Sequence, residues 1–114
     1  MLTIDKLKEF GADTSEGLSR CMGNEDFYLK MVSMGIADER FETIRGVLEK
    51  GDYDAAFDMA HAIKGVLGNL ALTPIFGPVD EMTEHLRARD KDVDYMSYCK
   101  EMEDQLARLK SMIA

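Results

Sequence analysis

Three residues in the middle of the 114-residue chain have types and spacing that suit chemistry on a helix surface. His61 is followed by Lys64 and Gly65, in a segment whose other residues favour helix. Residues three and four positions apart lie on the same face of a helix. A neutral imidazole is a competent nucleophile near physiological pH, because its ordinary pKa is about 6.5. It can attack phosphorus and hold a phosphoryl group through a P–N bond.

Lys64 and two nearby glycines would complete such a site. An ammonium group one turn from the imidazole can stabilise the negative charge of a transferring phosphoryl group. Gly65 and Gly68 each cost a helix interior about 1 kcal/mol relative to alanine. We expect Gly65 to give a partner protein access to His61, whereas Gly68 suits access and tight helix packing equally well. We expect no metal or cofactor in this chain.

The elements that must position these residues are helices. The expected helices cover residues 3–10, 15–22, 24–50 and 52–69, a segment from Pro74 or Pro78 to about Arg89, and a last segment with Tyr95 to Ile113 on its buried face. Asp13 or Thr14, Asn24 and Thr73 have the side chains of N-caps. The segment 24–50 carries an apolar stripe at steps of three and four: Phe27, Met31, Met34, Ala37, Phe41, Ile44 and Leu48.

These helices predict an all-α fold, an antiparallel four-helix bundle with short additional N-terminal helices. We expect one domain over residues 1–114, in which residues 1–23 cover one end and residues 24–114 form the bundle. The apolar stripe of the segment 52–69 centres near Ala60 and Leu67. Because each residue turns the helix by about 100°, His61 should lie at the border between core and water.

Charge and composition exclude several classes of partner. The net charge of −8 disfavours nucleic acid and anionic lipid, since no basic patch offsets it. No apolar run approaches the roughly 20 residues of a membrane span, and the N-terminus lacks the apolar region of a signal peptide. Cys21 and Cys99 are far apart in sequence, which favours two reduced cysteines in a helical core. A protein partner or a small molecule remains, and we expect a cytoplasmic, monomeric protein.

The motif His61-x-x-Lys64-Gly65 resembles the signature of histidine-containing phosphotransfer (HPt) domains. The upstream stretch GADTSEGLSRCMGNEDFYLKMV, residues 11–32, also resembles the region that precedes this signature in the family. The resemblance implies a phosphorelay intermediate in two-component signal transduction, without enzymatic turnover of its own. His61 would take a phosphoryl group from a response-regulator receiver domain or a hybrid histidine kinase and pass it to another receiver. The required magnesium would belong to the receiver.

Two further candidate site residues lie on the helix that follows the His61 helix, where the sequence differs from the family pattern. Chemotaxis kinases have a glutamate on the next helix where, counted from His61, this chain has Thr83, and many HPt domains have a glutamine near that place. Thr83 and Arg87, one turn further along, are candidate accessory residues. The alternatives are a phosphoacceptor domain cut from a larger hybrid or chemotaxis-type histidine kinase, and a helical binding module that is not phosphorylated.

Overall fold

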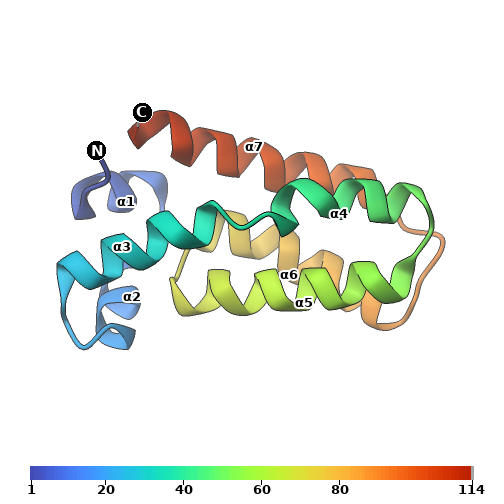
Figure 1. Cartoon of the computed structure of the whole chain (residues 1–114), viewed down its shortest axis with the longest axis horizontal. Coiled ribbons are helices and arrows are strands. Elements are labelled where there is room, and N and C mark those ends of the chain that lie inside the picture. Colours follow the sequence, from blue (N-terminus) through green and yellow to red (C-terminus); the bar gives the residue numbers. More distant parts are fainter. Residues whose placement is uncertain (114) are drawn as a thin grey trace.

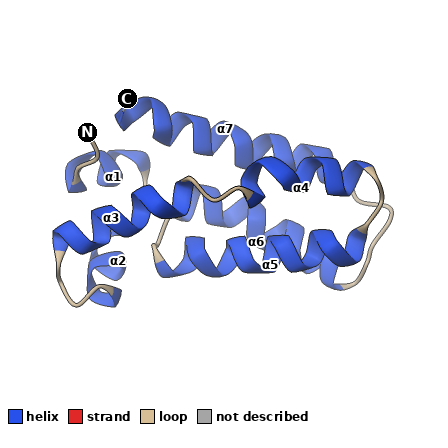
Figure 2. Cartoon of the chain, viewed as in Figure 1, coloured by secondary structure: helices blue, strands red, loops and turns tan. Residues whose placement is uncertain are grey.

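The computed structural model describes residues 1–113, and over that range the chain forms seven helices (Figures 1 and 2). They are α1 (Ile4–Phe10), α2 (Thr14–Arg20), α3 (Glu25–Ile36), α4 (Arg40–Glu49), α5 (Tyr53–Asn69), α6 (Thr73–Arg87) and α7 (Tyr95–Ile113). Ala114, the last residue of the expected domain, lies outside the described residues. None of these seven helices is both long and apolar enough to cross a bilayer.

Four helices close the bundle. Helix α4 packs against α5 and α7, and α6 packs against the same two helices, so that the four enclose one core. Helices α1, α2 and α3 lie at one end of this bundle (Figure 1). The predicted all-α, antiparallel four-helix bundle with short N-terminal helices is therefore confirmed.

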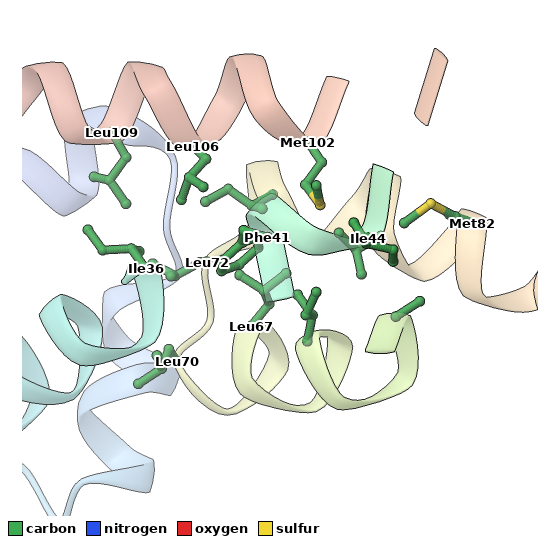
Figure 3. Close-up of a cluster of buried hydrophobic side chains, with 14 of the residues drawn as sticks. Ile36, Phe41, Ile44, Leu67, Leu70, Leu72, Met82, Met102, Leu106 and Leu109 are labelled. Carbon is green, nitrogen blue, oxygen red and sulfur yellow. The ribbon is translucent and has the colours of Figure 1, made fainter. Parts of the chain in front are cut away.

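The core is made by apolar side chains that all four bundle helices turn inward (Figure 3). Ile44, Leu67, Met82 and Met102 come from α4, α5, α6 and α7 respectively, and each is at most 1% exposed. Removing these side chains from water is the main favourable contribution to the fold. This burial fixes the rotation of each bundle helix, including that of α5.

Side-chain caps set where most helices begin. The carboxylates of Asp13 and Asp52 and the amide oxygen of Asn24 each accept a hydrogen bond from the backbone N–H three residues on. Asp13, and not Thr14, is therefore the cap of α2. For α6, the prediction that Thr73 caps the helix is wrong, because Leu72 is the N-cap and Thr73 the first helical residue.

Two prolines lie in the first half of α6. Pro74 is in the first turn, where a missing backbone N–H costs nothing. Pro78 lies inside the helix, which continues without interruption to Arg87. Of the two expected starting points for this helix, the structure therefore selects the one at Pro74.

The expected single helix over residues 24–50 is interrupted, which corrects the prediction. Helix α3 ends at Ile36, and α4 begins at Arg40. The Asp38 carboxylate accepts a hydrogen bond from the Arg40 backbone N–H at 2.9 Å and pairs with the Arg40 guanidinium at 2.6 Å. An aspartate that bonds the backbone two residues on competes with helix continuation and starts a turn.

The break also explains an error in the predicted core face of α3. Phe27 is 48% exposed and Met34 is 59% exposed, although both belong to the predicted stripe. The residues that α3 buries are Tyr28, Val32 and Ile36. After the break, Phe41, Ile44 and Leu48 are buried as predicted. A restart of the helix changes its phase, so one continuous stripe cannot describe both halves.

Tyr28 attaches the N-terminal helices to the end of α5. Its hydroxyl donates a hydrogen bond to the carbonyl oxygen of Leu70 at 2.8 Å, and burial raises its pKa to about 12. Gly17 of α2 faces this ring, and a Cβ atom there would lie 2.4 Å from Tyr28 Cζ. The ring cannot easily move aside because it is fully buried and hydrogen-bonded. Glycine at position 17 is therefore required for this close approach.

The two cysteines are free and buried, as the sequence predicts. Burial raises the pKa of the Cys99 thiol to about 11. A thiol that remains protonated at neutral pH is a poor nucleophile, so Cys99 serves as an apolar core residue.

We predict that Gly17→Ala lowers the free energy of unfolding by about 1–3 kcal/mol, because the added methyl group overlaps the Tyr28 ring. The control is Gly46→Ala in α4, where a Cβ atom meets nothing within 4 Å. There the change should be neutral or stabilising by up to about 1 kcal/mol. Urea unfolding of both variants measures the difference, and equal stabilities would contradict the packing described.

Candidate functional site

His61 lies on the outer surface of α5. Ala60 and Leu67, which lie on the inner face of the helix, about 100° and 120° around its axis from His61, are buried in the core, whereas His61 is exposed. The imidazole stacks on the ring of Phe57, one turn earlier, with ring centroids 5.6 Å apart and ring planes inclined by 23°. The stack orients the imidazole while leaving it in contact with water.

A shallow open groove of about 490 Å³ begins at His61. Four of the residues singled out from the sequence line it together: His61, Lys64, Gly65 and Gly68. Its other lining residues come from α2 and its N-cap, from the end of α5, from the α5–α6 connection and from the start of α6: Asp13, Glu16, Arg20, Leu67, Asn69, Ala71, Thr73 and Phe76.

The two glycines in the groove have different surroundings. A Cβ atom at Gly65 would meet nothing within 4 Å, so the surface beside His61 is open there. A Cβ atom at Gly68 would lie 3.4 Å from Cε2 of Phe76 on α6. Gly68 therefore lies at the α5–α6 packing contact, while Gly65 leaves room above α5.

Lys64 is held by two carboxylates of α6. Its ammonium nitrogen lies 2.8 Å from Oδ1 of Asp80 and 3.4 Å from Oε1 of Glu84. The hydrogen bond with Asp80, supported by the one with Glu84, raises the pKa of the Lys64 ammonium above its ordinary value. Lys64 is thus charged at neutral pH and already paired within the protein.

Arg87 contacts the site through Phe57. Its guanidinium carbon lies 5.1 Å from the centre of the Phe57 ring, and its Nε is 3.2 Å from Glu84. Arg89, which the sequence places only in a turn, lies 4.8 Å from the same ring centre. Both are within range of a cation–π contact. The Phe57 ring therefore links His61 to two guanidinium groups.

Thr83 lies away from the groove, which corrects its selection as a candidate accessory residue. Its side chain is fully buried, and its hydroxyl donates a hydrogen bond to the carbonyl oxygen of Val79 at 2.6 Å. A threonine hydroxyl within a helix commonly donates its hydrogen bond to the backbone carbonyl oxygen four residues earlier. The hydroxyl is therefore not available to the His61 ring.

Helix α2 contributes groove residues that the sequence reasoning did not select. Asp13, the N-cap of α2, and Glu16 and Arg20 within α2 line the groove. The Arg20 guanidinium donates to Glu16 at 3.0 Å and to the side-chain oxygen of Asn69, the last residue of α5, at 3.3 Å. The sequence gives no signal for this contact, because it depends on how α2 docks on the bundle.

We predict that Phe57→Leu moves the NMR resonances of the His61 ring protons, because the stacked aromatic ring is lost. Loss of the two cation–π contacts should also lower the free energy of unfolding by about 1 kcal/mol. Phe76→Leu is the matched control, since Phe76 lines the groove but packs on Gly68. Unmoved His61 resonances in Phe57→Leu would contradict the described stack.

The sequence of the chain matches one known protein family. A family model described as Hpt domain matches residues 35–112, which include α4, α5 with His61, α6 and all but the last residue of α7. Comparisons with curated proteins and with solved structures each gave no match. Hpt domains carry phosphoryl groups on a histidine in two-component systems and interact with response-regulator receivers. Since the match spans more than half of the chain, this protein belongs to the Hpt domain family.

Proposed function

We propose that His61 is the phosphoryl acceptor of this Hpt domain and exchanges the group with the aspartate of receiver domains. The observation that carries the proposal is the exposed imidazole at the rim of a groove that is open at Gly65. An incoming aspartyl phosphate can approach this ring without displacing a side chain at position 65. The other histidine, His85, is half-buried against the ring of Tyr98, with centroids 5.7 Å apart.

The proposed step is a direct transfer. The lone pair of a neutral His61 ring nitrogen attacks phosphorus, and a P–N bond forms. The bond between phosphorus and the aspartate oxygen breaks, and its electron pair leaves with the carboxylate. Passing the group to another receiver is the reverse of this step. Positioning and charge stabilisation supply most of the catalysis in such transfers.

Lys64 would supply part of that stabilisation from this chain. Lys64 lines the same groove as His61, so its ammonium group can turn from the α6 carboxylates toward phosphoryl oxygens. We propose that the magnesium ion belongs to the receiver and that this chain needs no cofactor of its own. The protein would act as a monomeric carrier that each pair of transfers regenerates. Its partners would be receiver domains and a hybrid histidine kinase.

We expect a phosphorylated receiver, in the presence of magnesium, to transfer acid-labile phosphate to the wild-type chain and not to His61→Gln. His85→Gln is the matched control and should accept phosphate at the wild-type rate, because His85 lies outside the groove. Gel assays with radiolabelled receivers, tested one at a time, give the measurement. Labelling of His61→Gln would refute the proposed acceptor, and no labelling of wild type by any receiver would favour a binding module.

A second prediction concerns access. Gly65→Leu should slow transfer by roughly 10- to 100-fold, because the side chain would keep the partner's reacting atoms away from the imidazole. Gly46→Leu places the same side chain at an open position on α4 outside the groove and should leave the rate unchanged. Single-turnover kinetics of both variants test this, and equal rates would show that the partner does not approach over Gly65.

A further inference from the structure

Helix α6 places two carboxylates on the ammonium group of Lys64, which is one turn of α5 away from His61. Asp80 and Glu84 are four residues apart and therefore lie on the same face of α6. Their oxygens lie 2.8 Å and 3.4 Å from the Lys64 nitrogen. Glu84 is in turn shared with Arg87 at 3.2 Å. Two cations and two anions thus form one chain of contacts across the α5–α6 boundary.

The formal charges of these four side chains, two positive and two negative, sum to zero. A phosphoryl group on His61 would add roughly −1.5 to −2 charges at neutral pH next to them. To stabilise that group, the Lys64 ammonium must leave or share its contacts with Asp80 and Glu84. The same carboxylates would then face a second anion at short range, which disfavours the phosphorylated state.

The ion pairs of Lys64 with Asp80 and Glu84 can break and re-form during phosphoryl transfer. The side chains of Lys64, Asp80 and Glu84 are 25%, 39% and 53% exposed, so water screens all three. Ion pairs at such sites are weak and can be exchanged without loss of the fold. The lysine can therefore move between the α6 carboxylates and a phosphoryl group.

We propose that Asp80 and Glu84 are positioning residues that restrain Lys64 and thereby bias the phosphoryl group away from His61 and toward the receiver aspartate. This inference rests on the proposed function. In the favoured direction, the P–N bond breaks and its electron pair stays on the imidazole nitrogen, while an aspartate oxygen of the receiver forms the new bond to phosphorus. Return of Lys64 to Asp80 and Glu84 accompanies the loss of the phosphoryl group.

The test measures the equilibrium between the phosphorylated chain and one receiver that exchanges phosphate with it. Asp80→Asn and Glu84→Gln should each raise the fraction of phosphate held on His61, with a change in the equilibrium constant of about three- to tenfold. The double variant should raise it further. Glu81→Gln is the matched control, because it removes one charge from the same helix and Glu81 forms no ion pair with Lys64. An unchanged or lowered fraction, or an equal rise in Glu81→Gln, overturns the inference.

A second measurement separates restraint of the lysine from other effects of the substitutions. NMR titration of the Lys64 ammonium in the unphosphorylated protein should show a lower pKa in the Asp80→Asn, Glu84→Gln double variant and no change in Glu81→Gln. In a Lys64→Met background, Asp80→Asn should shift the equilibrium no more than Glu81→Gln does. A full shift without the lysine would overturn the inference.

These outcomes are distinguishable from failure of the proposed function. If no receiver phosphorylates the wild-type chain, the proposed function fails. If wild type is phosphorylated on His61 and the α6 variants behave as wild type, only the inference about Asp80 and Glu84 fails. Circular dichroism and urea unfolding of each variant confirm that the fold is retained.

Discussion

The site depends on how α5 is rotated in the bundle. Its inner face is made of Ala56, Ala60, Ile63 and Leu67, which are buried between α4 and α6. Burial of this narrow apolar face leaves the helix one stable orientation, since any large rotation would expose it to water. His61 follows Ala60 in sequence. The burial of Ala60 and the other inner-face residues therefore places His61 on the outer surface.

Charge is balanced locally around this imidazole even though the whole chain carries a net charge of −8. Lys64 is paired with Asp80 and Glu84, and Arg20 is paired with Glu16. Arg89 is paired with Asp54 on α5 at 2.6 Å. Each cation near the groove thus has an anionic neighbour, so the surface offers a partner exchangeable ion pairs in place of a fixed positive patch. Exchangeable pairs suit a transient encounter.

Much of this arrangement could be predicted from the sequence. The period of the apolar residues in 52–69 is unambiguous, so the outward position of His61 and the open surface at Gly65 follow from it. In α3 two apolar stripes overlap, one through Phe27 and Met34 and one through Tyr28 and Val32, and the break at Asp38 decides between them. The spacing of apolar residues cannot predict such a break, because it depends on a local hydrogen bond from the backbone to the Asp38 side chain.

The parts that could not be predicted are contacts between helices. Asp80 and Glu84 reach Lys64, and Arg20 reaches Asn69, because of the register between neighbouring helices. Sequence spacing fixes which residues share a face of one helix but not which face of a neighbour they meet. For the same reason Thr83, chosen by counting from His61, turns out to be buried and bonded to Val79.

The proposed acceptor role requires one imidazole nitrogen of His61 to form a covalent bond to phosphorus. The most direct measurement is NMR of the chain, labelled with ¹⁵N in its histidine rings, after incubation with a phosphorylated receiver. If His61 is the acceptor, ³¹P–¹⁵N coupling will appear on a His61 ring nitrogen and the His85 ring will be unchanged. Coupling on His85, or phosphate on the chain without coupling to either ring, would contradict it.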